Sequence, residues 1–270
     1  MAESTASRTP GGTPPEPGPL RTLLVAFAVC AVCATLVSTS VVVLRPLQLE
    51  NQRRDRELKV RALVGGLPGL GELLAEAGEA ELELRVVELA SGAYAPSVDP
   101  EALLRARDDE IESLPLPPER DLAGIGRRPR YAPVYLLQRG DALDTLVLPV
   151  HGKGYLSTIR GYLALAGDGN TVRGITFVEH EETPGLGSEI DSPAWRSSWN
   201  DKRLRDERGE VRIRVVREAP PHGSEEAPHR VQGISGATKT SDGVSDLVRF
   251  WVGPDGFGPF LERIRQGGDA

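Results

Sequence analysis

The sequence predicts an α+β protein: one membrane-spanning helix near the N-terminus, then a mainly antiparallel sheet with flanking helices. Three observations support this fold class. An uncharged apolar run comes first, several β-rich runs joined by short turns follow, and a segment with helical apolar periodicity comes late in the chain. Because few helical segments separate the β-rich runs, we expect most neighbouring strands to pair antiparallel.

The apolar run covers 22 uncharged residues from Leu23 to Leu44, between Arg21 and Arg45. About 20 apolar residues suffice for a helix to cross a bilayer core. A cleaved signal peptide is the alternative, but its apolar core has only about 7–15 residues. We therefore expect an uncleaved transmembrane helix over residues 21–45. Residues 1–20 hold five prolines and three glycines, which predicts a disordered tail.

Residues 46–133 are expected to form a membrane-proximal part of mixed, partly helical structure. A charge-rich polar helix follows the span, and a loop rich in glycine and proline comes at 65–71. This loop lacks the G-x-G-x-x-G spacing of dinucleotide-binding loops, so we assign it no cofactor. Residues 82–89 alternate like a strand, and 99–107 predict a short helix with Pro100 at its start.

Strand signals dominate residues 134–265, the predicted main domain, after a charged loop at 108–133 that holds five prolines. The β-rich runs are 134–137, 145–150, 159–165, 172–178 and 211–216. Short turns are predicted at 151–154 and 167–170, where glycine recurs between apolar runs. Residues 266–270 are expected to be a tail.

The last predicted element is a helix that follows a cluster of hydroxyl groups. Its apolar residues recur at helical spacing: Val244, Leu247, Val248, Trp251 and Val252. Thr240, Ser241 or Asp242 can cap its N-terminus. The hydroxyl cluster over residues 235–241 therefore lies where free N–H groups and the helix dipole favour a bound phosphate. An ordinary Ser/Thr-rich helix start is the alternative, and the spacing alone leaves both open.

Composition excludes several classes of function. A net charge of −7 and a pI near 5.3 argue against a nucleic-acid-binding surface. Both cysteines, Cys30 and Cys33, lie inside the apolar run, so the rest of the chain has no thiolate for an iron–sulfur cluster or a disulfide. The four histidines lack metal-ligand spacing, and no metal site is predicted. Electron transfer by this domain would require an organic cofactor.

The motif Ser235-Gly236-Ala237-Thr238, followed by Lys239-Thr240-Ser241-Asp242-Gly243-Val244, resembles the covalent flavin attachment motif of the FMN-binding domain family. This domain occurs in the C subunit of the sodium-translocating NADH:quinone reductase and in the G subunit of the Rnf electron-transport complex. In that family the last threonine of the motif carries FMN through a phosphoester bond, so the resemblance implies this role for Thr238. Gln232 stands where the family usually has aspartate.

The resemblance extends over a long part of the chain. Residues 149–165 and 170–199 are similar to the C subunit, and the similarity runs from the span to about Arg265, which favours the sodium pump over Rnf. It includes Gly152-Lys153-Gly154, where His151 stands at a position that commonly holds tryptophan. It also includes residues 182–187, where glycine lets the backbone approach a flavin ring. Without the resemblance, that stretch is a plain Pro-Gly turn.

Two groups of residues are therefore predicted to bind FMN, one at its ring and one at its phosphate end. They are Glu182, Thr183, Pro184, Gly185, Leu186 and Gly187 in the loop, and Ser235, Gly236, Ala237, Lys239 and Thr240 around the attachment residue Thr238. Glu179, Glu181 and Glu182 form an acidic cluster beside the loop. Tuning of the flavin potential or cation binding is one interpretation of this cluster, and a solvated face is the simpler one.

The resemblance implies a single-pass subunit of a bacterial inner membrane whose FMN domain faces the periplasm. It would relay electrons within a six-subunit complex that couples NADH:ubiquinone oxidoreduction to sodium export. Its partners would be the other membrane subunits, with a separate flavin transferase for maturation. Two alternatives remain: the G subunit of an Rnf-type ferredoxin:NAD complex, and a membrane-anchored scaffold without a catalytic role.

A hydrolase is the competing enzyme class. The stretch Gly233-Ile234-Ser235-Gly236-Ala237 differs by one residue from the nucleophile-elbow pattern G-x-S-x-G. That fold places the catalytic histidine after the serine, and no histidine follows His229. We therefore reject a hydrolase.

Overall fold

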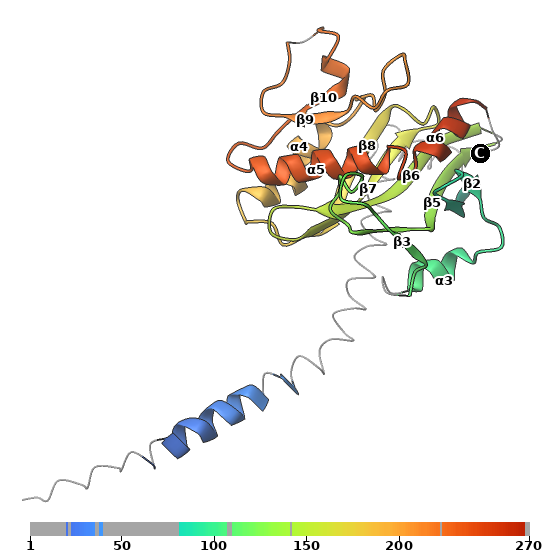
Figure 1. The fold of residues 1–270 in the computed structure, drawn as a ribbon. Coiled ribbons are helices and arrows are strands. Elements are labelled where there is room, and N and C mark those ends of the chain that lie inside the picture. The colour runs from blue at the N-terminus through green and yellow to red at the C-terminus, as the bar shows by residue number, and fades with distance from the viewer. Residues whose placement is uncertain are drawn as a thin grey trace, which may run out of the picture. The chain divides into compact units, whose positions relative to one another are not determined.

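The computed structural model describes residues 20, 23–35, 38–39, 81–106, 110–140, 142–221 and 223–267. The chain divides into two compact units, 1–54 and 55–270, and each is treated by itself (Figure 1). The polar helix expected directly after the span, the loop expected at 65–71 and most of the tail expected at 1–20 lie outside the described residues.

The first unit contains a helical stretch at residues 23–35, and residues 38–39 are helical too. The Thr35 hydroxyl donates to the Ala31 carbonyl at 2.7 Å, a bond typical within helices. Within the described ranges, no helix is both long enough and apolar enough to cross a bilayer. Part of the predicted span, including 40–45, lies outside those ranges, so the span stays a prediction.

The second unit is built on a six-stranded sheet of order β2-β1-β5-β6-β7-β8, in which every neighbouring pair is antiparallel. This confirms the predicted mainly antiparallel α+β architecture. The strands are β1 (Glu81–Glu88), β2 (Ala93–Tyr94), β5 (Tyr131–Arg139), β6 (Ala142–Lys153), β7 (Thr158–Ala166) and β8 (Val172–Glu179).

Strand β1 joins the N-terminal part of this unit to the sheet. It pairs with β5 along its whole length, from Glu81 opposite Gln138 to Glu88 opposite Tyr131. The described part of 46–133 therefore shares one sheet with the segment that follows. This part also holds the expected helix, α3 (Pro100–Arg105), and a short hairpin that was expected to be loop. The hairpin strands are β3 (Ser113–Pro115) and β4 (Arg127–Pro129).

Strand β6 is longer than the sequence suggested. Residues 151–153 were expected to turn, but they continue the ladder with β7, from His151 opposite Arg160 to Lys153 opposite Thr158. Lys153 also donates its N–H to the Ala123 carbonyl at 2.7 Å. The turn instead follows Gly154. Glycine was a misleading signal here: Gly152 is needed because a Cβ there would lie 2.6 Å from the Leu247 Cβ.

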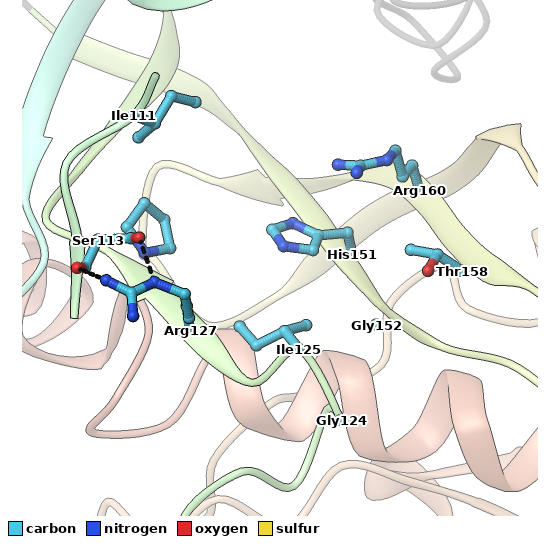
Figure 2. A pocket seen from close by; sticks show the side chains of 10 residues that line it. Ile111, Ser113, Gly124, Ile125, Arg127, His151, Gly152, Thr158 and Arg160 are labelled. Atoms are coloured by element: carbon cyan, nitrogen blue, oxygen red, sulfur yellow. Dashed lines mark hydrogen bonds between the residues drawn. The ribbon is translucent and has the colours of Figure 1, made fainter. Parts of the chain in front are cut away.

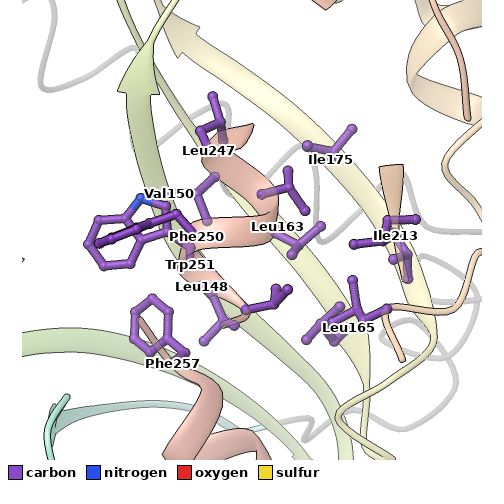
Figure 3. Close-up of a cluster of buried hydrophobic side chains, with 14 of the residues drawn as sticks. Leu148, Val150, Leu163, Leu165, Ile175, Ile213, Leu247, Phe250, Trp251 and Phe257 are labelled. Atoms are coloured by element: carbon purple, nitrogen blue, oxygen red, sulfur yellow. The ribbon is translucent and has the colours of Figure 1, made fainter. Parts of the chain in front are cut away.

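Helices α5 (Thr238–Trp251) and α6 (Gly258–Arg265) supply the apolar side chains that complete the core (Figure 3). Alternate residues of β6, such as Leu148 and Val150, face the buried side of α5, which carries Leu247 and Trp251. Each fully buried side chain of this size contributes about 1.5–3 kcal/mol. The Trp251 indole N–H also donates to the His151 carbonyl at 2.6 Å, which fixes the helix along β6.

Small elements connect the sheet to α5. They are the 3₁₀ helix η1 (Gly187–Asp191), α4 (Pro193–Ser197), β9 (Arg214–Val216), the 3₁₀ helix η2 (Ala227–His229) and β10 (Arg230–Gln232). The strand predicted at 211–216 is shorter than expected, and β9 pairs with β10 in parallel. The Gly233 N–H extends this pair by donating to the Val216 carbonyl at 2.7 Å. This pairing positions the short segment that leads from Gly233 to the start of α5.

Candidate functional site

Thr238 is the first residue of α5, and both Thr238 and Lys239 are exposed to solvent. Ala237 occupies the N-cap position, and no side chain caps the helix. The prediction that Thr240, Ser241 or Asp242 caps it is wrong, because the helix begins before them. The N–H groups of its first turn have no acceptor within the helix and point towards the region around Thr238.

The buried hydroxyls of the first turn serve the fold. Ser241 is 4% exposed, and its Oγ accepts from the Ile234 N–H at 3.0 Å. This bond holds the segment before the helix against the helix itself. The Trp195 indole N–H adds a second anchor by donating to the Gln232 carbonyl at 2.8 Å. Of the predicted hydroxyls around Thr238, Ser235 and Thr238 are exposed, whereas Thr240 is only 2% exposed.

Glu182 connects the loop to the helix. Its side chain is 4% exposed, and its Oε2 accepts from the Thr240 hydroxyl at 2.6 Å. The same carboxylate accepts from three consecutive backbone N–H groups in the turn after β6: Tyr155 at 3.3 Å, Leu156 at 3.0 Å and Ser157 at 3.3 Å. One carboxylate thus fixes the β6–β7 turn, the loop and the first turn of α5.

The loop that follows Glu182 is tightly folded. The Thr183 carbonyl accepts from the N–H groups of Leu186 and Ser188, both at 3.1 Å. Gly185 has a φ of +72°, a conformation that favours glycine, and its N–H donates to the Ser188 hydroxyl at 3.0 Å. As a result Pro184, Gly185 and Leu186 lie at the tip of the loop, where Gly185 and Leu186 are exposed.

Two glycines bring the predicted groups into contact. A Cβ on Gly187 would lie 2.7 Å from the Thr240 Oγ1 and 3.0 Å from the Glu182 Cβ, so only glycine fits beside that hydrogen bond. A Cβ on Gly236 would lie 3.2 Å from Leu186 Cδ2. Two stretches about 50 residues apart in the sequence therefore form one site.

The acidic cluster is split by this arrangement. Glu179 and Glu181 are exposed, which agrees with a solvated face. Glu182 is buried and already accepts four hydrogen bonds, so its carboxylate braces the loop from within. His180 extends the brace: its Nδ1 accepts from the Glu182 N–H at 3.2 Å, which leaves the proton on Nε2 to be donated to Asp191 at 2.9 Å.

The ionisation of Glu182 depends on these donors. Burial by itself raises the pKa of a carboxyl group, but the hydrogen bonds from Thr240 and from the N–H groups of Leu156, Ser157 and Tyr155 outweigh it. They hold the pKa of Glu182 below its ordinary value of 4.5. The carboxylate therefore adds stability that is complete above about pH 4.5 and is lost as the pH falls through the folded-state pKa.

We expect Glu182→Gln to lower the free energy of unfolding at neutral pH by about 1.5–3 kcal/mol, the usual range for hydrogen bonds to a charged group. We also expect the variant to lose less stability than the parent protein when the pH is lowered from neutral to well below 4.5, because it lacks the carboxylate whose stabilising hydrogen bonds are lost on protonation. Urea unfolding at both pH values measures this. Glu181→Gln, at an exposed neighbour, is the control. Equal acid sensitivity of the parent protein and Glu182→Gln would contradict a stabilising role of the Glu182 carboxylate.

An apolar surface surrounds the exposed end of the site. Tyr155 is 50% exposed, Leu156 60% and Leu186 45%. The Lys239 ammonium lies 4.9 Å from the centre of the Tyr155 ring. Tyr155 and Leu156 were not among the predicted site residues. The signal that could have found them is a pair of large apolar residues in the turn directly after Gly154. A positive charge, free helix N–H groups and exposed apolar side chains fit a ligand with a phosphate and a flat ring.

Comparison with known proteins identifies the family. A family model described as the FMN-binding domain matches residues 154–253. The C subunit of the Na(+)-translocating NADH-quinone reductase of Pseudomonas aeruginosa is 43% identical over 251 residues, which cover 92% of this chain and 96% of that protein. The chain belongs to this C-subunit family. The Yersinia pestis C subunit is 40% identical over 254 residues, covering 92% of this chain and 93% of that protein.

Solved structures agree with the C-subunit assignment. The crystal structure of Shewanella oneidensis NqrC has a TM-score of 0.66 at 28% identity and covers 78% of this chain and 98% of that one. The C subunit from Parabacteroides distasonis, at 24% identity and a TM-score of 0.54, covers 79% of this chain and 95% of that one and supports the fold alone. The family resemblance inferred from the motifs is confirmed. The FMN-binding model spans both predicted groups, Glu182–Gly187 and Ser235–Thr240.

Proposed function

We propose that this chain carries FMN covalently on Thr238 and relays electrons within a complex that couples NADH:ubiquinone oxidoreduction to sodium export. The observation that carries the proposal is an exposed threonine at the first position of an uncapped helix, inside the segment matched by the FMN-binding model. Bound FMN would supply the redox chemistry. The chain supplies attachment, orientation and electrostatic environment.

The phosphate end of FMN fits the start of α5. A phosphoester on Thr238 would keep one negative charge beside the unpaired N–H groups of the first helical turn, where the helix dipole favours an anion. Lys239 adds a positive charge at the adjacent position. Ser235, Gly236 and Ala237 approach this point as a compact turn, in which Gly236 has a φ of +79° and the Ala237 N–H donates to the Ile234 carbonyl at 3.1 Å.

The ring end fits the exposed loop tip and the turn opposite it. Leu186 contacts Gly236, which leads directly to Thr238, so a ribityl chain on Thr238 starts beside Leu186. Thr183, Pro184, Gly185 and Gly187 shape this loop, and Glu182 with Thr240 holds it against α5. We place the ring against Leu186 and Gly185. The proposed role of Glu182 and Thr240 is to position this surface.

We expect Leu186→Ala to shift the absorption maximum or the reduction potential of the flavin while leaving covalent attachment intact. Leu186 is 45% exposed, so its truncation should change stability little, and any change in the flavin reports contact. Absorption spectra and redox titration of the purified protein measure this. Leu156→Ala, at an exposed leucine of the opposite turn, tests the other wall. A spectrum and a potential equal to those of the parent protein would make the loop a structural turn only.

The relay function is tested in the assembled complex. NADH should reduce the Thr238-linked flavin within turnover time, and quinone should reoxidise it, as followed by rapid-mixing absorbance. The parent complex is compared with one that carries the Thr238→Ala variant of this chain. A flavin that stays oxidised during steady turnover would favour the alternative of a membrane-anchored scaffold.

The remaining parts of the proposal rest on the family. Relatives of 40–43% identity over 92% of the chain are named as the C subunit of the sodium-translocating reductase, which favours this complex over an Rnf-type one. We therefore propose the other membrane subunits of that reductase as partners and a flavin transferase as the maturation enzyme. We also propose that residues 21–45 anchor the chain in the inner membrane and that the FMN domain is periplasmic.

A further inference from the structure

A cavity of about 300 Å³ lies between the β3–β4 hairpin and the ends of β6 and β7 (Figure 2). The strands contribute His151 from β6 and Thr158 and Arg160 from β7. The hairpin side contributes Arg127 and Ile125. None of the residues predicted to bind FMN lines it.

The cavity is separated from the FMN site along α5. Gly152 lines the cavity and packs on Leu247, since a Cβ on Gly152 would lie 2.6 Å from the Leu247 Cβ. Leu247 is nine residues after Thr238, which places it about 13 Å further along the helix axis. In β7, Thr158 and Arg160 alternate with Ile159, which is fully buried, so they point away from the core. The cavity is therefore a site of its own.

The charge of its walls is positive. Arg127 and Arg160 line it, and none of the lining residues in the described chain is acidic. Arg160 is partly compensated, because its Nε lies 3.8 Å from Glu179 Oε2. The Arg127 guanidinium is held by the Ser113 hydroxyl at 2.9 Å and the Ser113 carbonyl at 2.6 Å, both neutral partners, as Figure 2 shows. These bonds orient the guanidinium without neutralising it.

The other walls are apolar and small. Ile111, Ile125 and Pro129 line the hairpin side, so a ligand here would place an apolar body against them and an anionic group near the arginines. A volume of about 300 Å³ is at the small end of ligand pockets, which span roughly 300–1,000 Å³.

We propose that this cavity binds a small organic monocarboxylate with an apolar body. A guanidinium held by neutral partners matches a carboxylate in geometry and charge. Among the described residues Arg127 is held by neutral partners and Arg160 lies near one carboxylate, so the two arginines suit a single negative charge better than a phosphate dianion. The isoleucines and the proline bury the apolar body, and the Thr158 hydroxyl supplies a further hydrogen-bonding group on the opposite wall.

The test uses the full-length, flavin-bearing protein and benzoate as the probe, with binding measured by equilibrium dialysis of the labelled compound. We expect saturable binding at one site. Benzamide, a neutral compound of the same shape, and inorganic phosphate should each bind at least about tenfold more weakly. Benzamide has no negative charge for the guanidinium, and phosphate has no apolar body for the apolar wall. Binding of benzamide as tight as that of benzoate would overturn the anionic site, and tighter binding of phosphate would overturn the carboxylate assignment.

Two variants tie the binding to this cavity. His151→Trp fills the cavity and should abolish benzoate binding. Arg127→Gln removes the guanidinium charge and should weaken binding about tenfold or more, the usual loss for a hydrogen bond to a charged group. Arg208→Gln removes an exposed arginine elsewhere and should bind like the parent. Melting temperature and flavin content check folding. Parental binding in either His151→Trp or Arg127→Gln would overturn the proposal.

Discussion

Replacement of Thr238 by alanine is expected to abolish covalent flavin completely while the protein stays folded. Thr238 is exposed at the first position of α5, where its side chain does not cap the helix. Surface substitutions of this kind usually change stability by about 0.5 kcal/mol or less. The parent protein should show the mass of one esterified FMN and yellow fluorescence after denaturing electrophoresis, and the variant should show neither.

Matched variants separate the hydroxyl from its surroundings. Thr238→Ser keeps a hydroxyl at the same place and should retain part of the covalent flavin. Ser235→Ala removes the neighbouring exposed hydroxyl and should retain the parental amount. Thr240 and Ser241 are poor alternative sites for flavin attachment, because both are buried and hydrogen-bonded within the protein. Covalent flavin at the parental level in Thr238→Ala would move the attachment to another hydroxyl, with Ser235 the nearest exposed one, and overturn the assignment.

Local patterns predicted the elements that position this site. The apolar spacing of Val244, Leu247 and Trp251 predicted α5, because one helical face must meet the sheet. Alternation and β-branched residues predicted β1, β5, β6, β7 and β8. The motif around Thr238 predicted a helix start near an exposed threonine, and the structure has one. These features depend on residues that are near one another in the chain.

The features that sequence reasoning missed depend on contacts between distant residues. Glu182 was predicted to bind the cofactor, and local patterns did not indicate that its carboxylate also accepts from Thr240, 58 residues later, and from the Tyr155 N–H, 27 residues earlier. No local pattern distinguishes a buried bracing glutamate from the exposed Glu181 next to it. The length of β6 was missed for the same reason: Gly152 signalled a turn, whereas its small size serves the packing of α5.

The side of the membrane on which the FMN domain lies is predicted differently by two arguments. Within about 20 residues of the predicted span, two basic residues precede it and six follow it. The positive-inside rule would therefore keep the domain in the cytoplasm. That rule describes loops up to about 60 residues, however, and about 225 residues follow Arg45. The resemblance implies a periplasmic domain, so we expect the N-terminus inside and the domain outside.

Labelling of a single introduced cysteine in intact cells decides between the two. The cysteine must replace an exposed residue that makes no structural contact. Asp168 is exposed but unsuitable, because its carboxylate fixes the turn after β7 by accepting from the N–H groups of Asn170 and Thr171, both at 2.8 Å. Glu207 is exposed, so Glu207→Cys should leave the fold intact. Cys30 and Cys33 are replaced by serine so that no other thiol reacts.

An impermeant thiol reagent should modify Glu207→Cys in intact cells to the same extent as after lysis, because a periplasmic thiol is accessible in both cases once the outer membrane is permeable to the reagent. A separate variant, Ser7→Cys, has its single cysteine in the predicted cytoplasmic tail; it should react only after lysis and controls for leaky cells. The opposite pattern, with Ser7→Cys labelled in intact cells and Glu207→Cys protected, would show that the basic residues after the span hold the domain inside. The periplasmic assignment would then be wrong, although attachment at Thr238, which depends on the start of α5, would be unaffected.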